Sequence, residues 1–108
     1  SNQVIAVLDM GYSLLEDCGF TRAEAVRATG QLVMRNIENV LEAGCDGALT
    51  GPIERNDIET VKKHIACMQN DDSDDVRLYK MLGTKLVNIA EKKNPDKDYT
   101  QMMELLRG

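Results

Sequence analysis

The pattern of apolar and polar positions along the chain predicts a protein made almost entirely of helices. Residues 3–17 are apolar almost all round a helical cylinder, and Asp9 is the only formal charge before Glu16. A helix of this kind is buried or covered on two sides, so it needs partners from another subunit or another domain. We expect it to end near Gly19, because glycine readily adopts the left-handed conformation of a helix C-cap.

A long second helix is predicted over about residues 22–43. It begins at a capping box, Thr21-Arg22-Ala23-Glu24, and Gly44 is expected to end it. Gly30 lies inside this helix, where it costs about 1 kcal/mol relative to Ala, and we interpret it as a point where another helix approaches closely. The apolar positions expected on one face are Val26, Val33, Ile37, Val40 and Leu41.

Three shorter helices are predicted in the second half of the chain, over about residues 57–68, 75–92 and 97–106. Asn94-Pro95-Asp96 separates the last two, because proline removes a backbone donor and restricts the residue before it. No strand alternation is present, so the expected fold is all-α, with about five helices in a single domain over residues 1–108. The positions expected to face inward are Ile58, Val61, Ile65, Met68, Tyr79, Leu82, Leu86, Ile89, Ala90, Tyr99, Met102, Met103 and Leu106.

Composition and charge narrow the classes of function. The chain of 108 residues has a formal net charge of −5, which argues against nucleic acid or an anionic membrane surface as its main partner. No apolar run approaches the roughly 20 residues that a membrane span requires. The three cysteines show no C-x-x-C spacing, so a reduced, cytoplasmic setting is the simplest interpretation.

Two groups of ligand-type residues are interpreted as structural. The aspartates between residues 71 and 75 lack the glycine and the distant glutamate of an EF-hand, which leaves a solvated linker. His64 and Cys67 can face the same side of a helix, but a zinc site needs three or four ligands, and Cys18 and Cys45 have no supporting spacing. The chain also lacks a glycine-rich nucleotide fingerprint, so it does not bind a nicotinamide cofactor by the usual route on its own.

The stretch over residues 47–57, GALTGPIERND, is a shaped turn between long helices, with two glycines and one of the two prolines. One interpretation is structural: the glycines permit unusual backbone angles, Asn56 or Asp57 caps the next helix, and Arg55 pairs with Asp57. The other interpretation is functional. Exposed N–H groups at a helix start, with Arg55 and the Thr50 hydroxyl beside them, make a place for a carboxylate or phosphate.

The same stretch resembles part of a known family. Ala48-Leu49-Thr50-Gly51-Pro52-Ile53, followed by Arg55, Asp57 and Thr60-Val61-x-x-His64, is similar to the second domain of a family of NAD(P)-dependent oxidoreductases. In that family a Rossmann-like domain precedes an α-helical domain of unknown function. The helical domain is similar to the dimerisation domains of pyrroline-5-carboxylate reductase and 6-phosphogluconate dehydrogenase. The opening Ser1-Asn2 and the long second helix match as well, so the resemblance covers essentially the whole chain.

The resemblance implies a helical bundle like the C-terminal domain of 6-phosphogluconate dehydrogenase, with an N-terminal Rossmann cofactor domain upstream of this chain. It implies a homodimer, a small-molecule substrate, and NADP or NAD bound by the other domain. This chain is then expected to hold no cofactor or metal and to be inactive alone, and no catalytic residue is identified. The implied substrate-binding residues are Asn2, Thr50, Gly51, Arg55 and Asp57, with Asn2 near the domain junction.

The alternative is a stand-alone all-α protein-interaction module without catalytic activity. The acidic balance and the six methionines would suit adaptable contacts between helices.

Overall fold

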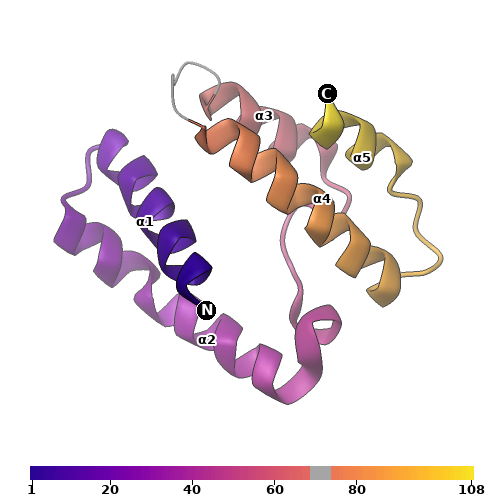
Figure 1. The fold of residues 1–108 in the computed structure, drawn as a ribbon, viewed down its shortest axis with the longest axis horizontal. Helices are drawn as coiled ribbons and strands as arrows, with labels where there is room; N and C mark the ends of the chain where they lie inside the picture. Colours follow the sequence, from indigo (N-terminus) through magenta and orange to yellow (C-terminus); the bar gives the residue numbers. More distant parts are fainter. Residues whose placement is uncertain (69–73) are drawn as a thin grey trace. The chain divides into compact units, whose positions relative to one another are not determined.

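The structure, a computed structural model, describes residues 1–68 and 74–108, and within these ranges it contains five α-helices and no strand (Figure 1). The all-α fold class is therefore confirmed. Most of the predicted acidic linker lies outside the described residues. None of the described helices is both long enough and apolar enough to cross a bilayer. The helices are α1 (Asn2–Asp17), α2 (Arg22–Ala48), α3 (Ile58–Met68), α4 (Asp75–Lys93) and α5 (Thr100–Arg107).

The chain forms two compact units, Ser1–Asn39 and Val40–Gly108. The first is a helical hairpin of α1 and the larger part of α2, as far as Asn39 (Figure 1). Helix α1 ends where predicted, since Gly19 has a φ of 105° and its N–H donates to the Glu16 carbonyl at 3.0 Å. The capping box is also confirmed. The Glu24 N–H donates to the Thr21 hydroxyl at 3.1 Å, and the Thr21 N–H donates to the Glu24 carboxylate at 3.0 Å.

Arg22 is the main polar link between the two helices of the hairpin. Its guanidinium lies 3.0 Å from Asp9 Oδ1 and 2.9 Å from Glu16 Oε1, and 5.5 Å from the centre of the Tyr12 ring. The side chain of Arg22 is 45% exposed, and exposed ion pairs of this kind contribute about 0–1 kcal/mol each. The hairpin would therefore need apolar burial for most of its stability.

That apolar burial is almost absent from the first unit. Helix α1 has no buried residue, and Ala25 is the one buried residue of α2. Ile5 is 65% exposed and Leu32 is 62% exposed, although both are large apolar side chains. Two helices without a shared core are marginal in water. The apolar surface, defined as the exposed side chains of this unit's two helices, consists of Val4, Ile5, Val7, Val26, Leu32, Met34 and Ile37.

Two glycines of α2 had predicted roles: Gly44 as the end of the helix, and Gly30 as a point of close helix approach. Gly44 has φ 76° and ψ 175°, so it interrupts the helix as predicted, but the chain makes another helical turn and ends at Ala48. Within the Ser1–Asn39 unit no helix approaches Gly30 closely, since a Cβ added there would meet nothing within 4 Å. The predicted approach of another helix at Gly30 stays a prediction.

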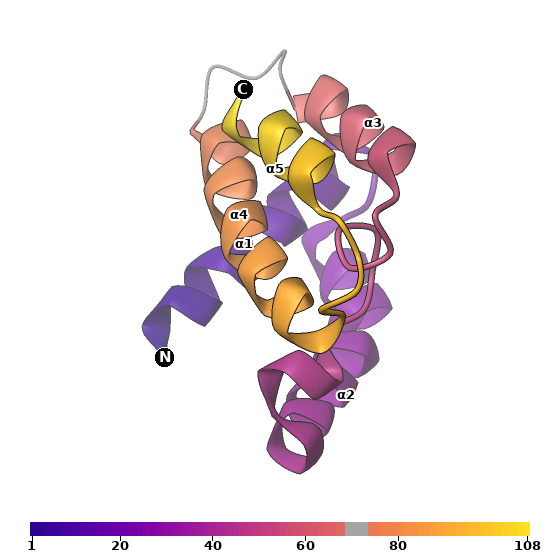
Figure 2. The same ribbon diagram turned by 90° about the vertical axis from the view of Figure 1, so that its right-hand side faces the viewer.

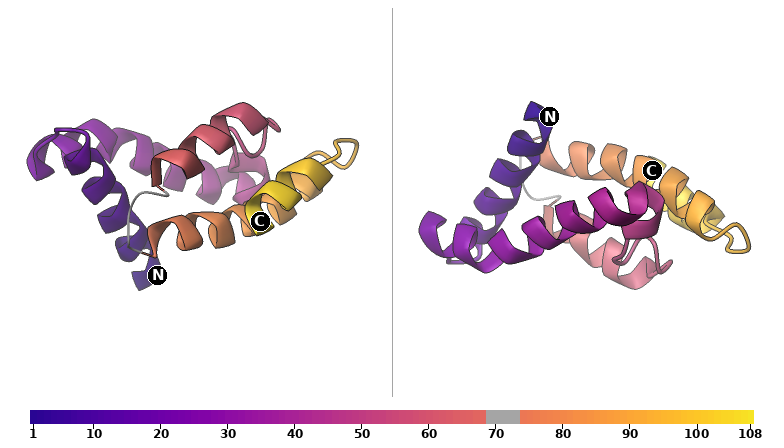
Figure 3. Two further views of the ribbon diagram at one scale, coloured as in Figure 1. Left: turned by 90° about the horizontal axis from the view of Figure 1, so that it is seen from above. Right: turned by 90° about the horizontal axis from the view of Figure 1, so that it is seen from below.

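The second unit contains the hydrophobic core, which α3, α4 and α5 build together (Figures 2 and 3). Helix α4 contacts both α3 and α5, and α3 contacts α5. Met102 and Val61 are fully buried at the centre. The predicted stripe of α3 is confirmed at its three buried positions, Val61, Ile65 and Met68, while Ile58 packs against the core half-buried.

The inner face of α4 differs in part from the prediction. Ala90 is buried as expected, whereas Tyr79, Leu82, Leu86 and Ile89 are half-buried. The other buried positions of α4 are Gly83 and Val87, which the prediction omits. A Cβ on Gly83 would lie 2.8 Å from Leu106 Cδ2 and 3.3 Å from Ile53 Cδ1. This glycine therefore lets α5 and the loop before α3 pack directly on α4.

The connection between α4 and α5 is longer than predicted. Asn94 has φ −127° and ψ 72°, outside the helical region, as expected for a residue before proline. Asp98 Oδ1 accepts hydrogen bonds from the Thr100 N–H at 2.9 Å and the Thr100 hydroxyl at 2.6 Å. Because this local turn occupies the chain as far as Thr100, α5 begins at Thr100 rather than at residue 97. Tyr99, Met102 and Leu106 are buried as predicted, and Met103 is half-buried.

Candidate functional site

The candidate site is the loop between α2 and α3, referred to below as the 49–57 loop, which contains a hydrogen-bonded turn over residues 51–57. The Arg55 N–H donates to the Gly51 carbonyl at 3.0 Å, and the Asp57 N–H donates to the Pro52 carbonyl at 2.8 Å. Gly51 and Asn56, at φ 101° and 61°, occupy left-handed conformations that suit glycine and asparagine. The sequence thus specifies a defined turn here, as predicted.

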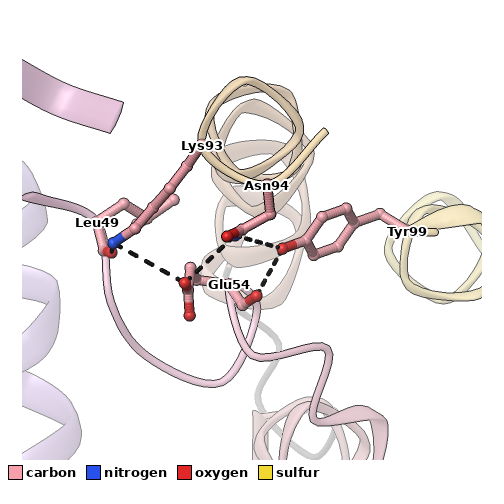
Figure 4. Close-up of polar contacts among 5 residues, drawn as sticks. All are labelled: Leu49, Glu54, Lys93, Asn94 and Tyr99. Carbon is pink, nitrogen blue, oxygen red and sulfur yellow. Dashed lines mark hydrogen bonds and ion pairs between the residues drawn. The ribbon is translucent and has the colours of Figure 1, made fainter. Parts of the chain in front are cut away.

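Side chains from the end of α4 and from the start of α5 fasten this turn (Figure 4). The Tyr99 hydroxyl donates to the Glu54 carbonyl at 2.6 Å, and Lys93 Nζ donates to the Leu49 carbonyl at 2.6 Å. Asn94 Nδ2 donates to Glu54 Oε1 at 3.3 Å and to the Tyr99 hydroxyl at 3.0 Å. The loop backbone is therefore fixed to the core of the second unit.

Lys93 and Glu54 also form a partly buried ion pair. Lys93 Nζ lies 3.8 Å from Glu54 Oε1, and the two side chains are 28% and 14% exposed. Lys93 ends α4, where a cation is favoured by the partial negative charge of the helix C-terminus. Removal of either partner would leave the other charge shielded from water without a counterion, which is costly.

Asn56 provides a second connection between the loop and the α4–α5 connection. Its Nδ2 donates to the Asp98 carbonyl at 2.8 Å, and its own left-handed backbone places the side chain in reach of that partner. Asn56 Oδ1 is buried and has no hydrogen-bond partner in the part of the chain that the structure describes. The loop is thus held at Leu49, Glu54 and Asn56.

The predicted ligand residues Thr50 and Arg55 lie on the exposed side of the turn. Thr50 is exposed, and the Arg55 side chain is 59% exposed. Arg55 Nη2 lies 3.7 Å from Asp57 Oδ2, so the predicted local ion pair is present. Since this pair is long and exposed, the guanidinium keeps donors for an incoming carboxylate or phosphate.

Asp57, and not Asn56, caps α3. Its Oδ1 accepts from the Thr60 N–H at 3.1 Å, and its Oδ2 accepts from the Thr60 hydroxyl at 2.7 Å. The Thr60 hydroxyl first, then the Thr60 N–H and the Arg55 charge, hold the pKa of Asp57 below its ordinary value. Both carboxylate oxygens are therefore occupied by the chain itself. A contact between Asp57 and substrate stays a prediction.

Asn2 and Gly51 complete the predicted set. Asn2 is the first residue of α1, is exposed, and belongs to the Ser1–Asn39 unit, whereas the loop belongs to the Val40–Gly108 unit. Gly51 is half-buried and shapes the turn. A site that combines Asn2 with the loop stays a prediction.

Comparison with known proteins gives one result. Residues 1–86 match the model of the family described as Domain of unknown function (DUF2520). The chain belongs to the DUF2520 family. No curated protein and no solved structure matches it. The matched range contains the whole 49–57 loop but ends inside α4, so Lys93, Asn94 and Tyr99 lie beyond it.

A groove of about 640 Å³ on the second unit of this DUF2520 chain was not predicted from sequence. No predicted site residue lines it. Its lining combines apolar side chains with charged side chains of both signs, so its electrostatics select neither anions nor cations. The residues that line it are Val87, Glu91, Lys97, Asp98, Tyr99, Thr100, Met103, Glu104, Arg107 and Gly108.

The remaining ligand-type residues of the DUF2520 chain show no metal geometry. His64 Nδ1 lies 3.0 Å from the Tyr79 hydroxyl, with the rings edge to face, and burial raises the pKa of Tyr79. Cys67 is an exposed free thiol. Within residues 1–68 and 74–108, no group of three or more His, Cys, Asp or Glu side chains is placed to hold an ion.

Proposed function

We propose that this chain is the dimerisation and substrate-cleft domain of a cytoplasmic NAD(P)-dependent oxidoreductase. The observation that carries the proposal is the apolar surface of α1 and α2, which the Ser1–Asn39 unit by itself leaves exposed. Burial of apolar area is the main driving force of association, so a surface of this kind favours a covering partner. The resemblance of residues 48–64 to the oxidoreductase family suggests the partners: a Rossmann domain of the same protein and a second copy of the chain.

In the proposed reaction, a nicotinamide held by the Rossmann domain exchanges a hydride with a small carbonyl, imine or hydroxyl compound. The residues of this chain bind and orient that compound. Arg55 takes an anionic group through charge-assisted hydrogen bonds, and the Thr50 hydroxyl takes a polar group. Asn2 contributes from the domain junction, Gly51 gives the turn its shape, and Asp57 holds the Arg55 side chain. The exposure of Thr50 and Arg55 on a fastened turn supports these roles.

The experiment that tests this function is a titration of the full-length protein with NADP and with NAD, in which calorimetry measures the heat of binding. We expect one of the two dinucleotides to bind, because the protein is proposed to contain a Rossmann domain. The chain of 108 residues alone is the control and is expected to bind neither. Absence of binding by the full-length protein, together with an upstream sequence without a glycine-rich βαβ unit, would contradict the proposal.

A further inference from the structure

Two peptide groups of the 49–57 loop are held by side chains from outside it. Lys93 Nζ donates to the Leu49 carbonyl at 2.6 Å, and the Tyr99 hydroxyl donates to the Glu54 carbonyl at 2.6 Å (Figure 4). The peptide bond is planar, so a carbonyl oxygen and the N–H of the next residue move together. A bond to Leu49 therefore orients Thr50, and a bond to Glu54 orients Arg55.

The peptide group before Arg55 is fixed at both ends. Its oxygen accepts from Tyr99, and its N–H donates to the Gly51 carbonyl at 3.0 Å. The Glu54 side chain adds the ion pair with Lys93 at 3.8 Å and the bond from Asn94 at 3.3 Å. The direction in which the Arg55 side chain leaves the backbone is thus set by residues near the end of α4 and the start of α5.

We propose that Lys93 and Tyr99 are positioning residues of the 49–57 loop, which hold Thr50 and Arg55 in the arrangement that receives an anionic ligand. The ligand in this proposal rests on the proposed function, whereas the connections between Lys93, Tyr99 and the loop do not. Both residues lie beyond the DUF2520 match at residues 1–86, so the proposal extends the functional unit to the C-terminal part of the chain.

Neither residue is placed to contact the ligand itself. The Lys93 ammonium is occupied by the Leu49 carbonyl and by Glu54, and the Tyr99 side chain is 3% exposed with its hydroxyl bonded inside the chain. Their effect on a ligand is therefore transmitted through the loop backbone. This separates them from Arg55, whose guanidinium is the group that meets the anion.

The test is hydrogen–deuterium exchange of the full-length protein, read at the peptide that covers residues 49–57. Tyr99→Phe and Lys93→Met each remove one backbone connection, Tyr99→Phe with the acceptor of Asn94 and Lys93→Met with the Glu54 ion pair. We expect exchange in the loop to become about 5- to 150-fold faster, the range for a buried acceptor left without its donor. Tyr79→Phe and Lys92→Met remove the same chemical groups where neither contacts the loop, and they should leave its exchange unchanged. Lys93→Arg keeps a donor and should restore slow exchange.

The peptide over residues 58–68 separates positioning from general loss of structure. Its exchange should stay at the wild-type rate in Tyr99→Phe, which keeps the buried ring and therefore the packing. Wild-type exchange of the loop in both Tyr99→Phe and Lys93→Met would overturn the proposal. Equal acceleration of the loop and of residues 58–68 in Tyr99→Phe would overturn it too, because the hydroxyl would then support the whole unit.

Inorganic phosphate is the probe for the ligand. We expect phosphate to slow exchange of the wild-type loop and to have no effect on the loop of Arg55→Ala. In Tyr99→Phe, the phosphate concentration that slows loop exchange should be at least about 5-fold higher than in the wild type. Faster loop exchange in Tyr99→Phe with an unchanged phosphate requirement would overturn the link to ligand binding. Failure of the proposed anion site shows differently: phosphate then leaves the wild-type loop unchanged, while Tyr99→Phe and Lys93→Met still exchange faster.

Discussion

At the scale of single residues, an interaction can be predicted from the sequence when its two residues lie close together along the chain. Arg55 and Asp57 are neighbours, and their ion pair and the cap on α3 follow from local chemistry. Glu54 is held by Asn94 and Tyr99, which lie 40 and 45 residues further along the chain. No local pattern indicates that Glu54 has these partners. The exposed half of the candidate site was predictable, and its support was not.

The proposed role of Arg55 gives a prediction at this scale. Arg55→Ala in the full-length protein should weaken binding of an anionic substrate by about 1 to 3 kcal/mol, since a charge-assisted hydrogen bond is lost. Isothermal calorimetry measures the dissociation constant directly. Arg77→Ala is the matched control, because Arg77 is also exposed and pairs with an acidic neighbour, Asp74, at 3.1 Å. Equal affinities of wild type and Arg55→Ala would leave Arg55 with a structural role alone.

At the scale of helices, apolar periodicity and capping residues located every element but not every boundary. The capping box at Thr21 and the left-handed Gly19 set their boundaries by local bonds, and both predictions are confirmed. The chain adds a helical turn after Gly44, and α5 starts late because the Asp98–Thr100 turn competes with the helix. The close approach at Gly83 was not predicted. It depends on contact with Leu106 of another helix, and the pattern of one helix does not reveal that contact.

The packing at Gly83 gives a prediction for the α4–α5 contact. Gly83→Val should destabilise the second unit by about 1 to 3 kcal/mol, because the added atoms overlap Leu106 and Ile53 in the core. Urea unfolding, monitored by circular dichroism, measures the change in the free energy of unfolding. Gly30→Val is the matched control, since an added Cβ meets nothing within 4 Å there, and its unfolding midpoint should not fall. A midpoint for Gly83→Val at or above the wild-type value would show that α5 moves away without cost.

At the scale of the whole molecule, the two units differ in how they bury apolar side chains. The second unit has its own core, with Met102 and Val61 fully buried. The first unit has Ala25 as the one buried residue of its two helices. The apolar run at residues 3–17 predicted a helix that needs partners. The Ser1–Asn39 unit by itself does not bury this helix, and its partners stay a prediction. This contrast is the basis for the proposed association with a second copy and with a Rossmann domain.

Self-association through the first unit is tested by a pair of matched substitutions. Ile5 on α1 and Met81 on α4 are both 65% exposed, so neither substitution disturbs a core. Sedimentation of the wild-type chain at tens of micromolar, about the concentration that populates a weak dimer, should show a dimer or larger. Ile5→Glu should shift it to monomer by placing charges in the interface, whereas Met81→Glu should not. A wild-type monomer, or dissociation by Met81→Glu alone, would contradict the proposed interface.

The sequence by itself determined the elements of the described residues: five helices, the capping box at Thr21, the breaks at Gly19 and Pro95, and a defined turn between α2 and α3. Each of these features depends on residues within about one helical turn of one another, so it can be predicted from the local sequence. Only the tertiary structure decided which faces are covered and what holds the 49–57 loop. Val87, Gly83 and Tyr99 have their roles because distant segments meet there, and that meeting depends on the packing of α3, α4 and α5 together.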